Sequence, residues 1–384
     1  MTSAHLPDIA GRRIGLLTAW ASRRGGGVFE AVVAQVALLR ELGAEPVVIA
    51  LRDRHSMDDA ARLAGCELHH AEVLGPHQIG FAPQLGRLLD AAELDLLHLH
   101  GIWMYPSHAA AQWTRRSGKP CLISPHGMLD PWITRRGRWK KALARLGYER
   151  RAWRRAAAFH ALTVQEATDI GHESNRWDSM VVANAAPPAA LPPSTGRPPT
   201  ILYLGRIHPK KNVAALVEAW ARLHAAGSCH PDARLVIAGW GDPPDVAALE
   251  HSLQSAPPGI AFVGPQFGAE KADLLNEARF LALPSLSEGL PMAILESWAA
   301  GTPVLMSSEC NLPIGFKQGA ALDCGMDTAS VAAAMRRALV MSENEWLTMA
   351  QAAHRLAAGP FSRGAIARRW QRAYATLIAA SEAE

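Results

Sequence analysis

Two carboxylates, Glu288 and Glu296, stand eight residues apart beside a predicted helix start. Pro291 occupies the place of a first helical residue, because its fixed φ suits a helix start and its missing N–H is not needed there. The free N–H groups of such a start, here at 289–291, favour an anion and above all a phosphate. A carboxylate accepts hydrogen bonds at both oxygens and so suits vicinal hydroxyls. Phosphate donors between two hydroxyl acceptors describe a site for a sugar nucleotide.

The surrounding elements place this helix start at the edge of a sheet. The apolar run 280–283 is typical of a buried strand, and it ends at Pro284. The predicted helix ends at Gly301, and Pro303 follows in the usual order of glycine and then proline. Another strand begins at 304. In a strand, loop, helix, strand unit of this kind, the helix start lies at the carboxyl end of the sheet.

The stretch 284–304 also resembles the signature of a known family. Its pattern, P-S-x-x-E-G-x-P-x-x-x-L-E-x-x-A-x-G-x-P-V, is similar to the E-x7-E motif of the retaining glycosyltransferases of family 4. A bare pair of glutamates would usually mark a solvated helix face, so the surrounding matches carry the resemblance. It implies the GT-B fold, an α/β architecture of two Rossmann-like domains facing each other across a cleft. It also implies roles for individual residues: Glu288 contacts the donor sugar, Glu296 the ribose, and the donor further touches Gly289, Leu290 and Pro291.

A second element of the same half points to phosphate binding. A predicted strand at 200–204 runs into a turn that contains Arg206 and Lys211. The planar fork of an arginine and the compact charge of a lysine together suit a diphosphate. The turn resembles the family's G-R-x-x-x-x-K-[GN] element, which implies that both side chains bind the donor's phosphates. A later loop, by the same resemblance, holds the base and makes Gln266 and Phe267 candidates.

Length and composition favour two globular domains. The chain has 384 residues, 49% of them hydrophobic and 19% charged, too many for one typical core and too apolar for disorder. Six prolines between 187 and 199 predict a semi-rigid linker. We therefore expect an N-terminal acceptor-side domain at 1–183, a linker at 184–199 and a donor domain at 200–358. A C-terminal helix at 359–384 is expected to cross back to the first domain.

The expected cellular location follows from what the sequence lacks. It contains no run of 18 apolar residues, and its start has no signal-peptide pattern. Five scattered cysteines without a C-x-x-C pair favour reduced thiols and disfavour a zinc site. We expect a cytoplasmic protein, with or without attachment to the inner face of the cell membrane.

A glycine-rich turn, Gly25 to Gly27, follows the first predicted strand. A dinucleotide-binding fold has such a turn, but Glu30 occupies the position of its third glycine, where a bulky acid would obstruct helix packing. The turn instead resembles the family 4 loop that lies against the donor diphosphate, which makes Gly26 and Gly27 donor-site candidates. A tight turn without further function stays an alternative.

Two histidine-bearing strand ends point to the same half of the chain. His98 and His100 alternate with leucines on one predicted strand and so share a face. A two-histidine metal site lacks a third ligand, so structural hydrogen bonding is favoured, with His100 and Trp103 as acceptor-side candidates. His126 follows the next strand and matches the histidine that approaches the donor sugar in family 4. Asp130 is either a helix cap or an acceptor-side residue.

The segment 135–155 is strongly basic. It holds ten Lys or Arg residues and one acid, Glu149, so its net charge is +9 in a chain of net charge +4. Trp139, Leu143, Leu146 and Trp153 recur among these charges at helical spacing. A basic amphipathic helix of this kind binds an anionic membrane surface, whereas an ordinary solvated helix would pack its apolar stripe on its own sheet. Nucleic-acid binding is disfavoured because no recognition motif accompanies the charges.

Together these features predict transfer of a hexose from a nucleoside-diphosphate sugar to a saccharide or lipid-linked acceptor, with retention. The family and the basic segment suggest cell-envelope, exopolysaccharide or O-antigen synthesis. We expect no metal and no cofactor besides the sugar nucleotide, since no D-x-D motif stands at a plausible strand end. An epimerase or phosphorylase of similar fold is the main alternative; a dehydrogenase and a binding module without activity are also considered.

Overall fold

The chain folds into two compact units in the computed structural model, which describes residues 8–134, 138–189 and 195–383. The N-terminal unit comprises Met1–Val182 and Ala367–Glu384, and the C-terminal unit comprises Ala183–Ile366. The border between them falls at the start of the predicted linker, of which residues 190–194 lie outside the described residues.

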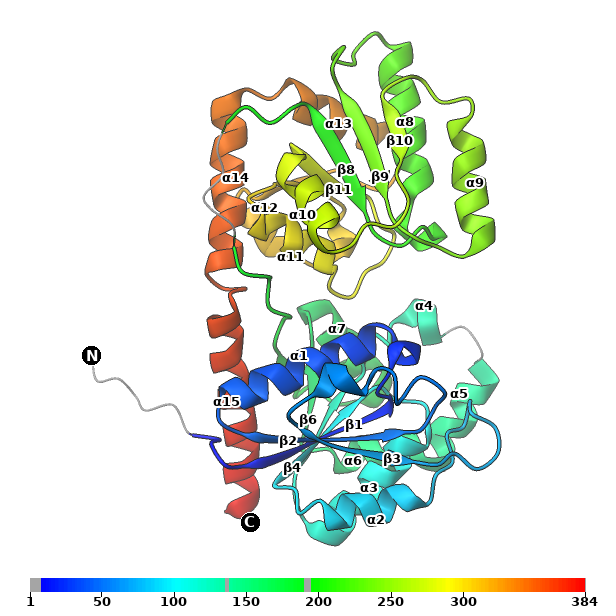
Figure 1. Cartoon of the computed structure of the whole chain (residues 1–384), viewed down its shortest axis with the longest axis vertical. Helices are drawn as coiled ribbons and strands as arrows, with labels where there is room; N and C mark the ends of the chain where they lie inside the picture. The colour runs from blue at the N-terminus through cyan, green and yellow to red at the C-terminus, as the bar shows by residue number, and fades with distance from the viewer. Residues whose placement is uncertain (1–7, 135–137, 190–194, 384) are drawn as a thin grey trace, which may run out of the picture. The chain divides into compact units, whose positions relative to one another are not determined.

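The N-terminal unit is built on a parallel sheet with the strand order β3-β2-β1-β4-β5-β6-β7. Its strands are β1 (Arg13–Trp20), β2 (Glu45–Leu51), β3 (Glu67–Ala71), β4 (Leu96–His100), β5 (Cys121–Ser124), β6 (Ala158–Ala161) and β7 (Met180–Val181). Helices cover both faces: Figure 1 shows α1 on one side of this sheet and α2 and α3 on the other. The helices are α1 (Gly27–Glu41), α2 (Gln84–Ala91), α3 (Tyr105–Ser117), α4 (Pro131–Thr134), α5 (Arg138–Ala144), α6 (Arg150–Arg155), α7 (Val164–Ser174) and α15 (Arg363–Glu382).

The C-terminal unit repeats this architecture with the strand order β10-β9-β8-β11-β12-β13, again parallel. Its strands are β8 (Thr200–Leu204), β9 (Arg234–Ala238), β10 (Ile260–Phe262), β11 (Phe280–Leu283), β12 (Val304–Met306) and β13 (Ala321–Asp323). Its helices are α8 (Val213–Ala225), α9 (Pro243–Leu253), α10 (Gly268–Glu277), α11 (Met292–Ala299), α12 (Pro313–Lys317), α13 (Thr328–Val340) and α14 (Glu343–Ala358). Within the described residues, no helix has the length and apolar character needed to span a bilayer.

The parallel pairing of both sheets explains why their strands are apolar, and the strand order indicates where ligands are expected. Strands of a parallel sheet are buried on both faces and so form continuous hydrophobic runs, as in β4 and β11, whose residues are all buried. The strand order reverses between β1 and β4 in one unit and between β8 and β11 in the other. Ligands of open α/β sheets bind at the carboxyl ends of the strands beside such reversals.

The basic segment is not the single amphipathic helix that its spacing suggested. It consists of α5, a π-helical turn at Arg145–Glu149 and α6, while residues 135–137 lie outside the described residues. The extra residue in the π turn rotates the two halves relative to each other. As a result Trp153 is buried, whereas Trp139, Leu143 and Leu146 are 66%, 62% and 68% exposed.

The last helix, α15, completes the core of the N-terminal unit, and Figure 1 shows it (red) alongside the elements of that unit. The buried hydroxyl of Tyr374 lies 2.8 Å from His98 Nδ1 and accepts a hydrogen bond from Gln35 Nε2, also at 2.8 Å. Trp370 packs against His160 with ring centroids 4.5 Å apart. Residues separated by more than 270 positions thereby share one buried polar network.

We expect Tyr374→Phe to destabilise the N-terminal unit. The substitution leaves Gln35 and His98 buried without their common partner, and each buried unsatisfied group costs about 1–3 kcal/mol. Urea unfolding of the full chain, followed by tryptophan fluorescence, would measure the loss, with exposed Thr376→Ala on the same helix as the control. Equal midpoints for the two variants would contradict a stabilising role of the Tyr374 hydroxyl.

Candidate active site

The carboxylate of Glu288 is the centre of a polar cluster in the C-terminal unit. It follows β11 and is only 7% exposed. Its two oxygens accept hydrogen bonds from Lys211 Nζ at 2.5 and 2.6 Å, and Oε1 also accepts from the Ser285 hydroxyl at 2.7 Å. Asn311 Nδ2 donates to the Glu288 carbonyl at 2.6 Å and fixes the main chain of the loop. Two predicted donor-site residues, Lys211 and Glu288, therefore form a nearly buried ion pair.

The helix start beside Glu288 lies one residue later than predicted. Helix α11 begins at Met292, and Pro291 precedes it with φ −73° and an extended ψ of 110°. The prediction failed because the φ of proline suits both a first helical residue and an extended one, and only ψ separates them. No side chain caps the helix within the described residues. Gly289 and Leu290 lead into this start, whose N–H groups are placed to bind an anion.

Glu296 lies on α11 and is held by a residue that the sequence did not single out. Its Oε1 accepts a hydrogen bond from Lys271 Nζ of α10 at 2.9 Å, and its side chain is 19% exposed. The ion pair keeps the carboxylate in place although no phosphate or ribose contact is present. Ribose binding by Glu296 stays a prediction.

Arg206 stands where two strand ends approach each other closely. A Cβ at Gly239 would lie 1.9 Å from the Gly205 carbonyl oxygen, so only glycine fits there. The Arg206 guanidinium pairs with Asp242 at 2.9 Å and lies 5.5 Å from the centre of the half-exposed Trp240 ring. An arginine at the carboxyl end of β8, held by a surface ion pair, is available to an anion because such pairs are weak.

The predicted base-binding residues lie on the loop after β10. Gln266 Nε2 donates to the Val263 carbonyl at 2.9 Å, which orders the loop. Phe267 precedes the first residue of α10 and is 66% exposed. These positions neither place a base nor exclude one, so base recognition stays a prediction.

His126 occupies a strained turn at the carboxyl end of β5. Its φ is 53° and that of Gly127 is 74°, a region that residues other than glycine seldom adopt. The buried carboxylate of Glu166 holds this turn by accepting the Gly127 N–H at 2.6 Å and the Leu162 N–H at 2.8 Å. Strain stored in this way is common at functional sites.

The predicted histidines form a buried network at the ends of three strands. His100 Nδ1 lies 3.0 Å from His126 Nε2, and the hydroxyl of Ser124 lies 2.6 Å from His98 Nε2 and 2.7 Å from His160 Nδ1. Burial, reinforced by His160, lowers the pKa of His126 to about 3. Burial likewise lowers the pKa of His160 to about 4 and that of His98 and His100 well below the ordinary value. All four imidazoles are therefore neutral at neutral pH.

The remaining acceptor-side candidates are Trp103 and Asp130. Trp103 follows β4 with a φ of 75° and packs against the core. Asp130 directly precedes α4, and its carbonyl accepts the N–H groups of Ile133 and Thr134, so Asp130 occupies the capping position at the start of this short helix.

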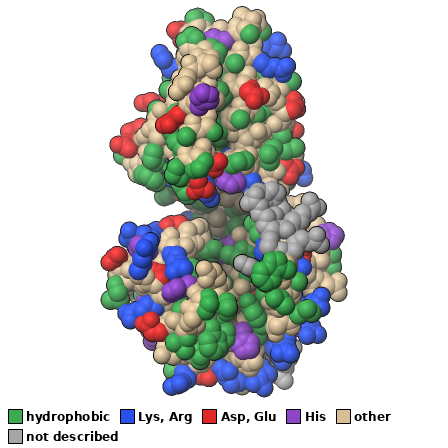
Figure 2. Space-filling view, turned by 90° about the vertical axis from the view of Figure 1, so that its right-hand side faces the viewer, with side chains coloured by type: hydrophobic (Ala, Val, Ile, Leu, Met, Phe, Trp, Pro, Cys, Tyr) green, Lys and Arg blue, Asp and Glu red, His purple; other side chains and the backbone are tan. Residues whose placement is uncertain are grey.

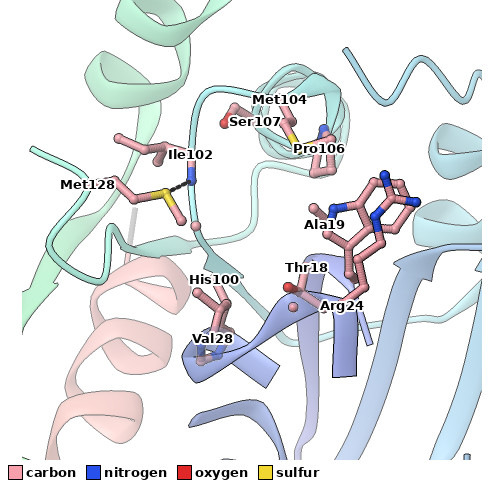
Figure 3. Close-up of a pocket in the computed structure, with 13 residues that line it drawn as sticks. Thr18, Ala19, Arg24, Val28, His100, Ile102, Met104, Pro106, Ser107 and Met128 are labelled. Atoms are coloured by element: carbon pink, nitrogen blue, oxygen red, sulfur yellow. Dashed lines mark hydrogen bonds between the residues drawn. The ribbon is translucent and has the colours of Figure 1, made fainter. Parts of the chain in front are cut away.

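A pocket of about 210 Å³ opens at the carboxyl ends of β1 and β4 in the N-terminal unit. Figure 3 shows His100, Ile102 and Met128 along one side of it and Arg24 on another. Apart from these, its walls are mostly apolar and include Thr18, Ala19, Val28, Met104, Pro106 and Ser107. Gly25 also lines the pocket. The predicted donor-site residues Gly26 and Gly27 come next in the chain, as the N-cap and the first residue of α1.

The sequence analysis did not identify several residues of these clusters. Glu166 follows Thr163 by three positions, the spacing of a capping box, and this signal predicts a cap but not the reach to Gly127. Ser285 and Lys271 carried no signal of their own. Among the described residues, no three His, Cys, Asp or Glu side chains are grouped so as to hold a metal ion.

We expect Lys211→Met to destabilise the C-terminal unit by about 3 kcal/mol, since it leaves the Glu288 carboxylate buried without its cation. Glu288→Gln in the same chain should restore most of the loss, because the remaining charge is then removed. Urea unfolding of both single variants and the double variant would measure the coupling, with exposed Lys317→Met as the control. A Lys211→Met chain as stable as the control would refute the pairing.

The chain matches solved structures over nearly its whole length. It superposes on Anabaena HepE, solved with UDP and glucose, with a TM-score of 0.73 at 15% identity, covering 95% of this chain and 100% of that one. Sucrose-phosphate synthase from Thermosynechococcus elongatus gives a TM-score of 0.68 at 18% identity, covering 96% and 100%. These similarities show the GT-B fold.

Curated relatives match less than half of this chain. The chain is 34% identical to Mycobacterium tuberculosis glycogen synthase over 174 residues, which are 44% of this chain and 38% of that enzyme. It is 27% identical to a Mycobacterium sp. D-inositol 3-phosphate glycosyltransferase over 156 residues, 39% of this chain and 34% of that one. The matched region thus spans little more than a third of the length of these relatives.

Two family models cover most of the chain between them. Residues 26–185 match the glycosyl transferase 4-like domain, and residues 198–340 match the glycosyl transferases group 1. The first ends and the second begins beside the border between the two units. With this pair of domains in this order, the chain belongs to the family 4 type of glycosyltransferases with the GT-B fold.

Proposed function

We propose that this protein transfers a hexose from a nucleoside-diphosphate sugar to a saccharide or lipid-linked acceptor, with retention at the anomeric carbon. The observation that carries the proposal is the meeting of Lys211, Glu288 and the uncapped start of α11 at one strand end. Cation, hydroxyl acceptor and N–H donors together suit a sugar diphosphate. The solved HepE structure, which holds UDP and glucose, supports the same ligand class.

The difficult step is departure of the diphosphate, on which negative charge develops. We assign its stabilisation to Lys211, Arg206 and the N–H groups that start α11, because fixed donors aimed at developing charge lower the barrier. Glu288 orients the sugar and Glu296 the ribose. These donors supply the charge that a metal ion would otherwise bring, so we propose transfer without a metal.

Retention follows in this proposal from attack on the face that the diphosphate leaves. A leaving phosphate oxygen takes the proton of the acceptor hydroxyl, so no enzymatic nucleophile is required. His126 is neutral at neutral pH because burial lowers its pKa to about 3. Since its Nε2 is engaged by His100, we assign Nδ1 to a hydrogen bond with the sugar.

We further propose that the acceptor binds to the N-terminal unit and belongs to envelope, exopolysaccharide or O-antigen synthesis in the cytoplasm. The apolar pocket beside His100 supports an acceptor with a hydrophobic part. Trp139 and Leu143 of α5 and Leu146 of the π-helical turn are all more than 60% exposed. Figure 2, which looks onto the side where α5 lies in Figure 1, shows hydrophobic side chains gathered there, with Lys and Arg side chains elsewhere on this unit. An anionic membrane surface would match both.

An epimerase or phosphorylase is the second candidate. This candidate is retained because an epimerase shares the fold. A putative UDP-N-acetylglucosamine 2-epimerase from Listeria monocytogenes superposes with a TM-score of 0.62 at 16% identity, covering 97% of this chain and 98% of that one. Product analysis separates the candidates: transfer yields a glycosylated acceptor, epimerisation an isomerised donor, and phosphorolysis a sugar phosphate.

The donor site can be tested by thermal shift. We expect one nucleotide family among UDP, GDP, ADP and TDP, with their sugar conjugates, to raise the melting temperature equally with and without EDTA. Glu296→Ala should lower the affinity for this nucleotide about 10- to 100-fold, which corresponds to the loss of a hydrogen bond to a charged group. Exposed Glu250→Ala serves as the control. Stabilisation that disappears in EDTA would contradict metal independence, and no stabilisation by any nucleotide would refute the donor site.

Membrane binding can be tested by flotation with phosphatidylglycerol vesicles. Changing the four exposed arginines of α6 to glutamate should abolish flotation, since each cation near an anionic surface contributes about 1 kcal/mol. These are Arg150, Arg151, Arg154 and Arg155. A charge-matched control changes four exposed arginines of the C-terminal unit, namely Arg222, Arg234, Arg336 and Arg337. Equal flotation of both variants would refute a role of the basic segment.

A further inference from the structure

The only acid of the basic segment, Glu149, is fully buried at the end of the π-helical turn. Its Oε1 accepts the Trp103 N–H at 2.5 Å. Its Oε2, the Ser107 hydroxyl and Trp153 Nε1 are buried and lack hydrogen-bond partners within the described residues. A carboxyl buried at such cost calls for a reason beyond packing.

The reason lies in the backbone that Glu149 holds. Trp103 has a φ of 75°, a conformation that costs a non-glycine residue about 1–3 kcal/mol unless its surroundings enforce it. Glu149 binds its N–H, and the adjacent Tyr148 donates its phenol hydroxyl to the Trp103 carbonyl at 2.9 Å. The Trp103 indole donates in turn to the Met128 carbonyl at 3.2 Å. Two consecutive residues of the basic segment thus clamp both sides of one strained residue.

The clamped residue determines a wall of the apolar pocket. Ile102 and Met104, the two neighbours of Trp103, both line it, and Figure 3 shows their side chains on the same stretch of chain. Ser107, which faces Glu149, also lines the pocket from the first turn of α3. A change in the Trp103 backbone would therefore move two wall residues together.

We propose that Glu149 is a positioning residue for the acceptor, which holds Trp103 in its strained conformation and thereby fixes Ile102 and Met104 in the pocket wall. The inference rests on the proposed function, in that it takes this pocket as the acceptor site. It links the basic segment to the pocket through a specific hydrogen bond and not through general packing.

The surroundings of Glu149 make the clamp sensitive to pH. The groups that face the carboxyl are the Trp103 N–H, Ser107 from α3, Trp153 from α6 and the neighbouring Tyr148. Burial raises the pKa of Glu149 to about 7, offset only in part by Ser107, the Trp103 N–H and Trp153, which favour the ionised form. Burial and Glu149 raise the pKa of Tyr148 to about 12, so the phenol stays neutral.

The cations described near this cluster are engaged elsewhere. Lys141 and Arg145 lie against the Trp103 indole, 5.8 and 5.5 Å from its centre, and Arg145 also pairs with Glu173. Ionisation of Glu149 makes it a stronger acceptor for the Trp103 N–H. The clamp therefore tightens above about pH 7. The folded state loses stability below that range, as the pH rises from the ordinary carboxyl pKa of 4.5 to about 7, because over that interval the carboxyl ionises in the unfolded chain but not in the folded one.

The test compares Glu149→Leu, Glu149→Gln and Tyr148→Phe in the full chain. Amide hydrogen exchange of the peptide 99–107 reports on the clamp. Transfer from UDP-glucose to n-octyl glucoside, an amphiphilic probe, reports on the pocket. In Glu149→Leu we expect the Trp103 amide to exchange at least about tenfold faster and the KM for the probe to rise about tenfold, the equivalent of one lost hydrogen bond. The KM for the donor should stay unchanged.

The other two variants separate positioning from general structure. Glu149→Gln keeps an oxygen for the Trp103 N–H, so it should restore protection and the KM for the probe. In the wild type we expect this KM to fall as the pH rises through about 7, and Glu149→Gln should abolish that fall. Tyr148→Phe leaves the buried carboxyl in place and should shift both measures in the direction of Glu149→Leu, by less.

Two results would overturn the inference: unchanged exchange of the Trp103 amide in both Glu149→Leu and Tyr148→Phe, or an equal rise of donor and probe KM in these variants. If the wild-type chain transfers no sugar to any acceptor, the proposed function fails. The exchange measurements need no activity, so they would still show whether Glu149 and Tyr148 hold the Trp103 backbone.

Discussion

A buried carboxylate must be surrounded by hydrogen-bond donors, and this requirement organises the C-terminal unit around Glu288. Lys211 reaches it from the turn after β8, and Ser285 from its own loop after β11. These two strands are the neighbours at which the strand order of the sheet reverses. The ion pair therefore fixes the two strand ends where a ligand of this fold would lie. The cation and the carboxylate are electrostatically coupled. A phosphate that bound Lys211 would weaken its ion pair with Glu288, and the carboxylate would then accept hydrogen bonds from hydroxyl groups more readily.

The buried polar side chains at the strand ends of the N-terminal unit include uncharged imidazoles. Its strand ends carry four imidazoles, and burial keeps all of them neutral by lowering their pKa values. Neutral rings can approach as closely as His98 and His100, whose centroids are 4.0 Å apart with the rings tilted by 34°, because no charge repulsion opposes the contact. Uncharged donors and acceptors suit the neutral hydroxyls of a sugar, whereas the cations of the other unit suit a diphosphate.

Local patterns predicted the fold well because both sheets are parallel and buried on both faces. The apolar runs at β8 and β11 and the helix that ends at Ala299, just before Gly301, all lie close to their expected positions. Side-chain partners were not predictable in this way. Lys271 meets Glu296, and Glu166 reaches Gly127, across distances in sequence that no local signal spans. The basic segment shows the limit most clearly, since one π-helical turn buries Trp153 while Trp139 stays exposed.

The return of α15 has a consequence for how the protein is made. The N-terminal unit lacks Ala367–Glu384 until the C-terminal unit has left the ribosome, because chains emerge from their N-terminus. Until then His98 and His160 lack Tyr374 and Trp370, their partners from the last helix. The nascent unit thus exposes polar and aromatic groups that its own chain covers last. Closure of so distant a contact is slow, and the second unit has time to fold as an autonomous insertion before the first is complete.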